Sequence, residues 1–297
     1  MAKVYFTRTI TPEAVVALYE MLGITLSGKV AVKVHSGEKG NTNFLRPPFW
    51  KPMVDRVNGT IVECNTAYGD AFGGVRDHTN SHKRLLKDHG WNDCFDVDLM
   101  DAEGPDLVWP IPDGKILKEN HVGKHMINYD SMLVLAHFKG HPMGGFGGAL
   151  KQLSIGCASS AGKALIHSGG QSDDIIGAWD MHADKNAFPE AMADAAASVV
   201  RHFAGQIAFI NVMKNLSVDC DCTTDPEPPC MQDIGILASL DPVAIDQACI
   251  DLVYHSDDPG RDHFVERVES RNGVHTIEAA AALGYGTRDY ELIEVEV

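Results

Sequence analysis

The stretch from Ser131 to Lys151 reads SMLVLA-HFKGHPMGGFGGALK and decides the fold class. Its first six residues, 131–136, form a nearly continuous apolar run, which is typical of a strand covered by other elements on both faces. The segment 137–151 is glycine-rich and leads into a helix that we expect over 147–155. A buried strand, a glycine turn and a helix in this order predict one unit of an α/β fold.

Strands and helices alternate on both sides of this unit. Thr11-Pro12 and Asp241-Pro242 each have the sequence of a helix start, with a capping residue before a proline. We expect helices after these two starts and over 81–89, 191–203 and 276–283, and strands over 3–7, 29–34, 60–63, 206–212, 234–238 and 292–297. The pattern predicts an α/β protein whose mixed or largely parallel sheet is covered by helices, as one large domain or two closely packed subdomains.

The charge of the chain is concentrated in its last part. Residues 1–170 contain 17 Asp and Glu against 18 Lys and Arg, whereas residues 171–297 contain 24 against 7. The formal net charge of −16 argues against non-specific binding to nucleic acids or anionic membranes, which need clustered positive charge. We therefore expect a subdivision near residue 170, with a small anionic ligand binding in the near-neutral, Gly- and His-rich first part.

The sequence also indicates the cellular compartment of the protein. The N-terminal residues lack the apolar core of a secretory signal, and no stretch of 18 apolar residues is present to span a membrane. The seven cysteines are an odd number and most lie far apart, unlike a disulfide framework. We expect a cytoplasmic protein with reduced thiols, in which grouped cysteines serve metal or redox chemistry.

The glycine-rich segment is the first candidate binding site. A glycine turn between a strand and a helix exposes backbone N–H groups, and the helix N-terminus attracts anions. In an open α/β sheet, ligands bind at the carboxyl ends of the strands, where this turn is expected. The candidate residues for binding a cofactor or substrate are Lys139, Gly144, Gly145, Gly147 and Gly148. Tight packing of the turn is the alternative reason for its glycines.

Common nucleotide motifs are missing from the chain. The string nearest to a phosphate-binding loop, GCASSAGKA at 156–164, has one residue too many between its glycines and an alanine where a Mg²⁺-binding hydroxyl belongs. No G-x-G-x-x-G follows an N-terminal strand. The sequence therefore predicts neither an ATP site nor an NAD site.

The cysteines of the second half form a candidate metal site. Cys220 and Cys222 are separated by one residue, and Cys230 follows eight residues later. Together with Cys157, which comes after the glycine turn, they would supply four thiolates for an Fe–S cluster, zinc or Cu(I). The neighbouring aspartates disfavour free thiolates, and a bound cation would relieve that repulsion. Unpaired thiols and a redox dithiol are the alternatives.

Acid–base and nucleophilic residues form a third group. His35 and Glu38 follow the strand expected at 29–34, so they are placed at the same edge of the sheet as the glycine turn. His141 and Lys151 belong to that turn and its helix. These four residues are the candidate catalytic groups, because they can exchange protons or hold an anion. No G-x-S-x-G nucleophile motif is present.

Four strings, taken together and in order, resemble the DUF362 family, whose members are often described as uncharacterised Fe–S centre proteins. They are KGHPMGGFGGALK at 139–151, IGCASSAGK at 155–163, DCDC at 219–222 and DIGILASLDPVAID at 233–246. The resemblance extends from VKVH at 32–35 to Cys249 and implies an α/β domain over the whole chain. It also implies that Cys157, Cys220 and Cys222 are family-type metal ligands, whereas Cys230 enters from its spacing alone.

Many relatives carry a ferredoxin-like insert that binds two [4Fe–4S] clusters, and the corresponding region here, 168–188, contains no cysteine. The leading hypothesis is a metal- or Fe–S-binding protein with a redox or electron-transfer role, acting on a small anionic molecule or a redox partner protein. The alternative is a non-redox lyase, isomerase or hydrolase that uses His and Glu side chains. A third hypothesis is a binding protein without catalysis.

Overall fold

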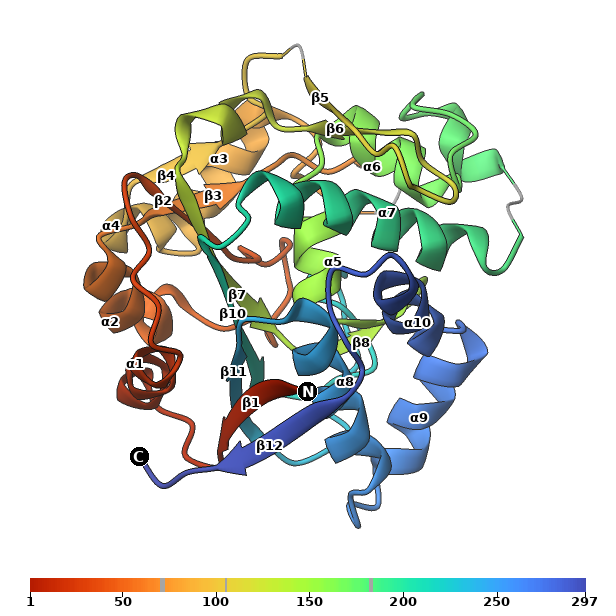
Figure 1. The fold of residues 1–297 in the computed structure, drawn as a ribbon. Coiled ribbons are helices and arrows are strands. Elements are labelled where there is room, and N and C mark those ends of the chain that lie inside the picture. The colour runs from red at the N-terminus through yellow and green to blue at the C-terminus, as the bar shows by residue number, and fades with distance from the viewer. Residues whose placement is uncertain (70–72, 105, 182–183) are drawn as a thin grey trace.

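The computed structural model describes residues 1–69, 73–104, 106–181 and 184–297, and its centre is an eight-stranded sheet (Figure 1). The strand order is β12-β1-β11-β10-β7-β2-β3-β4. β11 is antiparallel to both of its neighbours, and the other pairings in this sheet are parallel. The strands are β1 (Ala2–Thr7), β2 (Val30–Lys33), β3 (Thr60–Glu63), β4 (Val97–Leu99), β7 (Ser131–His137), β10 (Ile207–Met213), β11 (Gly235–Ser239) and β12 (Tyr290–Glu294).

Helices cover both faces of the sheet, and two short hairpins lie outside it. The helices are α1 (Pro12–Met21), α2 (Pro47–Val57), α3 (Thr79–Asp88), α4 (Trp91–Cys94), α5 (Ala149–Ser154), α6 (Ser160–His167), α7 (Ala187–His202), α8 (Pro242–Tyr254), α9 (Arg261–Ser270) and α10 (Val274–Ala282), with 3-10 turns η2 (Lys124–Asn128) and η3 (Gly177–Asp180). The hairpins pair β5 (Leu107–Pro110) with β6 (Glu119–Val122), and β8 (Lys139–His141) with β9 (Gly145–Gly147). In the described part of the chain, no helix combines the length and the apolar character needed to cross a bilayer.

β7 contributes side chains to the two large hydrophobic cores, as its apolar sequence predicts. Leu133 and Leu135 belong to the core with α1, α2 and α4, and Met132 and Val134 belong to the core with α5, α7 and α8. Each face of the strand is thus covered, which explains why it has no polar side. The α/β fold with a mixed, largely parallel sheet is confirmed. Both the near-neutral first part and the acidic second part of the chain contribute strands to this sheet.

The largest difference from the expected elements is α2, a helix that we did not expect from the sequence. Two of its three prolines, Pro47 and Pro48, stand in the first turn, where a missing N–H costs no helical hydrogen bond. Trp50, Met53 and Val54 form a buried face of this helix at helical spacing. Helices α6 and α9 and the two hairpins also lie outside the expected elements.

The parallel strands end at one edge of the sheet, and this edge carries the polar side chains of interest. β2, β3, β7 and β10 all run in the same direction, so the segments that follow them meet there. β11 runs in the opposite direction and starts at the same edge. The fold therefore gathers residues from four distant stretches of the sequence around one region.

Candidate functional site

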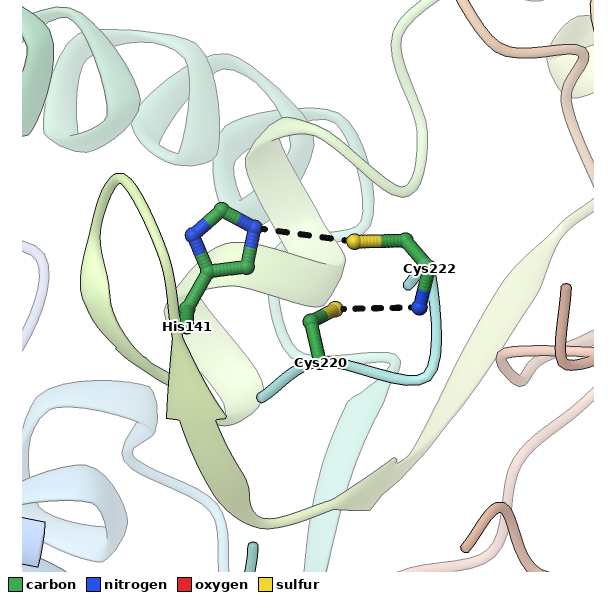
Figure 2. Close-up of side chains that lie close together, drawn as sticks. All are labelled: His141, Cys220 and Cys222. Atoms are coloured by element: carbon green, nitrogen blue, oxygen red, sulfur yellow. Dashed lines mark hydrogen bonds between the residues drawn. The ribbon is translucent and has the colours of Figure 1, made fainter. Parts of the chain in front are cut away.

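Cys220 and Cys222 lie in the segment that joins β10 to β11, and His141 of β8 faces them (Figure 2). One ligand atom from each of these three residues lies within 4.8 Å of the other two. The Nε2 atom of His141 is 3.8 Å from the sulfur of Cys222, and the backbone N–H of Cys222 donates to the sulfur of Cys220 at 3.4 Å. Within the described residues, these three side chains form the group whose possible ligand atoms lie close enough together to hold one metal ion.

The pKa values of the two thiols are shifted in opposite directions. Burial alone would raise the pKa of Cys220, but the hydrogen bond from Cys222 and the positive charge of Lys151 hold it well below its usual value. The Nζ atom of Lys151 lies 4.0 Å from the sulfur of Cys220. The hydrogen bond to Cys220 and burial raise the pKa of Cys222. Cys220 therefore loses its proton more readily than Cys222, and its sulfur faces Lys151.

The hydrogen bonds of His141 fix which of its nitrogens carries the proton. Its Nδ1 atom accepts from the backbone N–H groups of Met143 at 3.1 Å and Gly144 at 2.8 Å. Burial and nearby Lys151 lower the pKa of His141 to about 4, so the ring is neutral at pH 7. A neutral ring whose Nδ1 atom accepts must carry its proton on Nε2. In this arrangement His141 donates toward the thiolates, as second-shell groups do at metal centres.

Asp221 anchors the loop between the two cysteines. Its carboxylate bonds to His137 Nδ1 at 2.9 Å and to Lys139 Nζ at 2.9 Å, and all three side chains are buried. Burial alone would raise the pKa of Asp221, but His137 and Lys139 hold it well below its usual value. Burial would likewise lower the pKa of Lys139, and Asp221 instead raises it. Lys139, a candidate for ligand binding, is thus engaged in holding the cysteine loop.

A cavity of about 370 Å³ opens beside this cluster. His141 and Cys222 line it, together with residues from the ends of β2 and β3 and from α5 and α6. Its positively charged lining residues are Lys33, Arg76, Lys151 and Lys163, and Glu63 is the carboxylate among its described lining residues. This balance makes the cavity suitable for an anion.

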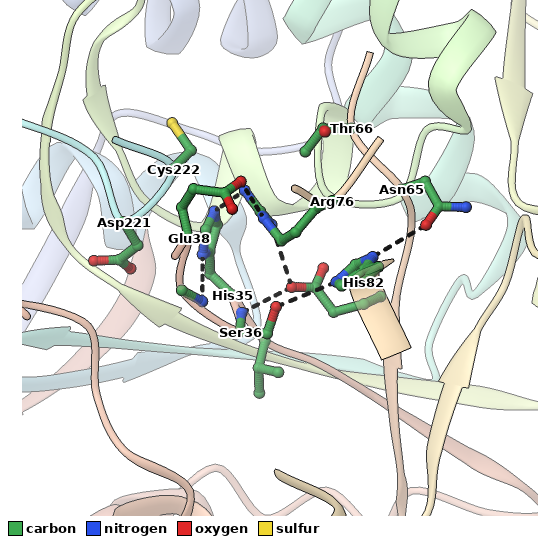
Figure 3. A network of polar contacts seen from close by, with 12 residues as sticks. His35, Ser36, Glu38, Asn65, Thr66, Arg76, His82, Asp221 and Cys222 are labelled. Carbon is green, nitrogen blue, oxygen red and sulfur yellow. Dashed lines mark hydrogen bonds and ion pairs between the residues drawn. The ribbon is translucent and has the colours of Figure 1, made fainter. Parts of the chain in front are cut away.

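Buried acids compensate two of the four cations. Lys33 pairs with Glu63 at 2.6 Å, and Arg76 pairs with Glu38 at 3.0 Å (Figure 3 shows the second pair). In the part of the chain that the structure describes, neither Lys151 nor Lys163 forms an ion pair with a carboxylate. Lys151 faces the sulfur of Cys220 and Lys163 donates to the carbonyl oxygen of Ala158, so neither charge is balanced by a carboxylate.

Two of the expected catalytic residues, His35 and Glu38, differ in whether they line the cavity. His35 lines the cavity, and burial together with Arg76 lowers its pKa, so its ring is neutral. Glu38 is fully buried outside the cavity lining, and it accepts from Arg76 and from the backbone N–H groups of Lys39 and Val75. Glu38 thus positions Arg76 and does not reach a ligand, which corrects the catalytic role expected for it.

Two of the four expected cysteine ligands lie elsewhere. Cys157 is fully buried in the core, where its carbonyl oxygen accepts from Cys64, and burial raises its pKa to about 12. Cys230 donates to the carbonyl oxygen of Leu216 at 3.4 Å. Neither belongs to the described cluster of ligand atoms. The expected four-thiolate set is therefore not brought together, because the segments that carry Cys157 and Cys230 pack into other parts of the fold.

A family model described as "Domain of unknown function (DUF362)" matches residues 30–251, which include β2, the glycine turn, the cysteine loop and most of α8. The chain belongs to the DUF362 family. The resemblance noted from the four sequence strings is thus confirmed. The family description gives no activity, so the function of this DUF362 chain has to be argued from its residues.

More distant similarities were found among solved structures. The lactate racemase apoprotein from Thermoanaerobacterium thermosaccharolyticum is 12% identical with a TM-score of 0.43, covering 70% of this chain and 50% of that chain. A crystal structure of a Thermotoga maritima protein from a structural genomics consortium is 12% identical with a TM-score of 0.41, covering 91% and 58%. The DUF362 chain thus spans half of the first structure and 58% of the second. No curated protein matches the sequence significantly.

The four candidate glycines of this DUF362 chain pack against other protein atoms. A Cβ atom on Gly148 would lie 2.3 Å from a carboxylate oxygen of Asp246, and Gly145, with φ +78°, contacts Gly273. Gly144 and Gly147 likewise lie against neighbouring side chains, and none of the four lines the cavity. The expected anion site at the start of α5 is occupied by Asp246, which accepts from the N–H groups of Ala149 and Leu150 at 2.8 and 2.9 Å.

Asp246→Ala is expected to destabilise the fold by about 2 kcal/mol, because two buried N–H groups lose their acceptor. Burial raises the pKa of Asp246 to about 6, from the usual 3.8 of an aspartate. The folded state therefore binds this proton more tightly than the unfolded state, and the resulting stabilisation is present below about pH 4 and lost as the pH rises through about 6. Urea unfolding at several pH values should show a fall in stability across this window for the wild type.

The matched comparison is the pH dependence of the variant. Asp246→Ala removes the titrating group, so its free energy of unfolding should change less between about pH 4 and pH 6 than that of the wild type. Equal slopes in the two proteins would contradict the assignment of this proton to Asp246.

Several functional residues were missed by the sequence reasoning. Arg76 lies between β3 and α3, in a segment to which we assigned neither an element nor a motif from the sequence. Lys33 interrupts an otherwise apolar strand, and a lysine at such a position is a signal of a buried charge with a partner. Lys163 was part of the string compared with a phosphate-binding loop. Glu63, which pairs with Lys33, is the last residue of β3, as Lys33 is the last residue of β2.

Proposed function

We propose that this chain binds one thiolate-preferring metal ion through Cys220 and Cys222, and a small anionic molecule in the adjoining cavity. The observation that carries the proposal is the closeness of Cys220 to Cys222, whose side chain lines a cavity together with several cations. The backbone N–H of Cys222 and the Nζ atom of Lys151 face the sulfur of Cys220. Such donors stabilise thiolates, whether or not a metal neutralises them.

The donor set fits a single soft or borderline ion, and Zn²⁺ is the ion that we favour. Zn²⁺ takes four ligands, commonly three from the protein at catalytic sites, so two thiolates would leave two positions for water or for oxygen atoms of the ligand in the cavity. Cys220 and Cys222 would supply two thiolates, and the cavity gives a ligand access from the side of Cys222. A bound Zn²⁺ would supply Lewis-acid chemistry, which polarises an oxygen of the substrate.

His141 fits the role of a hydrogen-bond donor to the cysteine sulfur atoms better than the role of a third metal ligand. A metal at its Nε2 atom would require the proton to move to Nδ1, and the N–H groups of Met143 and Gly144 would then have to leave Nδ1. The hairpin of β8 and β9 holds both of these groups in place. His141 therefore acts on the sulfur atoms in this proposal.

An Fe–S cluster with a redox or electron-transfer role is the second candidate, and the family resemblance is what favours it. Such clusters are held by four cysteines, with two histidines replacing two of them in one class. In the described structure, two cysteines and one histidine meet at the site, and Cys157 and Cys230 lie apart from them. The single-ion site is thus the better supported of the two, and with it a non-redox reaction in which His35 is available for proton transfer.

The anion is proposed because the cationic side chains exceed the acidic ones at the cavity. Lys151 extends from α5 and Lys163 from α6, so two helices that line the cavity each provide a lysine without a carboxylate partner among the described residues. Burial lowers the pKa of Lys163, and an anion beside it would favour its charged form. A small carboxylate or phosphate would satisfy both lysines.

The test is metal analysis of protein purified under anaerobic conditions. We expect close to one equivalent of zinc per chain and no acid-labile sulfide. Iron together with sulfide and visible absorption would instead support the redox candidate and a redox partner protein. Protein that contains no metal and takes up none from a stoichiometric Zn²⁺ solution would contradict both metal proposals.

A further inference from the structure

The ring of His35 lies between two N–H groups, one beside each of its nitrogens. The backbone N–H of Gly37 is 3.1 Å from Nδ1, and the Nη2 atom of Arg76 is 3.4 Å from Nε2 (Figure 3 shows His35 and Arg76 together). Burial and Arg76 lower the pKa of His35, so the ring is neutral. A neutral imidazole accepts at only one nitrogen, because the other carries the proton. One of the two contacts therefore brings two donors face to face.

The contact between two donors is the one that joins Nε2 to Arg76. The Gly37 contact is the shorter of the two, and it comes from a backbone N–H whose direction is fixed by the chain. Nδ1 thus accepts from Gly37, and the proton of His35 stands on Nε2. Arg76 cannot accept this proton in a hydrogen bond, since a guanidinium has donors only. An acceptor atom from a ligand would satisfy both N–H groups.

This pair of donors belongs to the wall of the cavity. His35 and Arg76 both line it, whereas Gly37 is not among its described lining residues. His35 is partly exposed and Arg76 is buried, so the histidine ring is the more accessible member of the pair. A ligand in the cavity therefore meets the Nε2 side of the ring, where the acceptor is needed.

The guanidinium of Arg76 is held in place by other contacts. Its Nε atom donates to Glu38 at 3.0 Å, and its Nη2 atom donates to the hydroxyl oxygen of Tyr68 at 3.3 Å. The Tyr68 hydroxyl donates in turn to the carbonyl oxygen of Cys222 at 2.8 Å. Donors that are fixed before a ligand arrives lose little conformational freedom on binding it. The pair is thus preorganised, and it is connected to the cysteine loop.

One oxygen atom can accept from both groups. Two nitrogen atoms 3.4 Å apart can each lie about 2.9 Å from the same oxygen, which is the usual length of an N–H···O hydrogen bond. An ionised oxygen is the favoured acceptor, because charge-assisted hydrogen bonds are roughly twice as strong as neutral ones. Glu38 already balances the charge of Arg76, so the pair contributes directed donors. Attraction over longer distances comes from Lys151, which lines the same cavity.

We propose that the Nε2–H group of His35 and the Nη2 atom of Arg76 together bind one oxygen of a small oxoanion, a carboxylate or a phosphate, in this cavity. The inference rests on the anion of the proposed function and names the residues that orient it. The bound oxygen lies between a residue that follows β2 and a residue that precedes α3. These are different elements from the helices that carry the two lysines.

NMR of full-length protein with isotope-labelled histidine tests where the proton stands. We expect His35 to carry its proton on Nε2, and we expect the signal of this proton to move downfield when inorganic phosphate or acetate is added. The His35→Gln variant identifies the signal by its loss. A proton on Nδ1, or an Nε2–H signal that responds to neither anion, would overturn the inference.

Two substitutions of His35 separate hydrogen bonding from packing. His35→Phe keeps a flat ring and removes the donor, so calorimetry should show phosphate binding about tenfold weaker than in the wild type. His35→Gln places an amide N–H near the position of Nε2 and should retain most of the affinity. His78→Phe, at an exposed residue outside the cavity lining, is the matched control and should bind phosphate as the wild type does.

The variants contradict the inference if phosphate binds equally well to His35→Phe and the wild type. Equal losses in His35→Phe and His35→Gln would do the same, because they would assign the effect to packing of the ring. The NMR measurement on the wild type decides the question if His35→Phe does not fold.

The outcome is distinguishable from failure of the proposed function. Lys151→Met removes a cation of the cavity and leaves His35 and Arg76 in place, so it reports on the anion site as a whole. Weaker phosphate binding in Lys151→Met with unchanged binding in His35→Phe would sink only the role of His35. A wild type that binds neither phosphate nor acetate would sink the proposed anion and this inference together. Zinc content, measured on the same samples, reports separately on the metal proposal.

Discussion

Cys220→Ser is expected to lose nearly all bound Zn²⁺, with an affinity at least about a hundredfold weaker than that of the wild type. Lys151 and the Cys222 N–H stabilise the thiolate form of Cys220, so of the two proposed ligands it is the one that is deprotonated more readily. A serine oxygen at this position is a much poorer ligand for a thiolate-preferring ion. Competition with a chromophoric chelator would measure the change in affinity.

Two further variants separate ligands from neighbours. Cys230→Ser is the matched control, because its sulfur bonds to the Leu216 carbonyl outside the cluster, and it should keep its zinc. His141→Gln should retain most of the metal, since His141 donates to the sulfur atoms and does not coordinate in this proposal. Loss of zinc in Cys230→Ser would show that the ligand set is wrong, and complete loss in His141→Gln would show that His141 is a ligand.

Glu63→Leu is expected to destabilise the protein by about 3 to 5 kcal/mol, because it leaves buried cations without their partner. The Glu63 carboxylate bonds to Lys33 Nζ at 2.6 Å and to the backbone N–H of Ser36 at 2.8 Å, and Arg76 lies 3.9 Å away. Burial alone would raise the pKa of Glu63, but Lys33 and the other nearby cations hold it well below its usual value. Urea unfolding of apo-protein at pH 7 would measure the loss.

The double variant Lys33→Met/Glu63→Leu tests the cause. Removing both partners of a buried ion pair is usually far less costly than removing one, since no charge is left alone in the interior. The double variant should therefore recover a large part of the stability that Glu63→Leu loses. If the single variant lost less than about 1 kcal/mol, or the double variant were no better, the pair would not have the role that its burial implies.

The fold was predictable because its signals are local. The run at 131–136 has apolar residues on both faces, and Thr11-Pro12 and Asp241-Pro242 mark helix starts in which the capping side chains accept from backbone N–H groups. Helix α2 was missed because prolines dominate its first turn and hide the apolar face of Trp50. Charged α9 was missed because its buried face is only Phe264 and Val268.

The site was predictable only in part, because its partners are distant in sequence. The spacing of Cys220 and Cys222 and the motif around His141 placed three residues of the cluster on the list of candidates. No local pattern shows that Cys157 turns into the core or that Asp246 fills the N-terminus of α5, since both depend on packing between elements about a hundred residues apart. The partner of Arg76 was equally hidden, because Glu38 lies on another loop.

The cysteine loop is also fastened from outside the segment that the family model matches. Arg267 of α9 donates to the carbonyl oxygen of Val218 at 2.6 Å and to the Asp219 carboxylate at 2.9 Å, and residues 252–297 lie beyond the match. Opening of the loop thus requires breaking contacts with a helix that contributes no ligand. If the site holds the proposed ion, we therefore expect the rate at which the ion enters or leaves to depend on α9 as well as on the ligands.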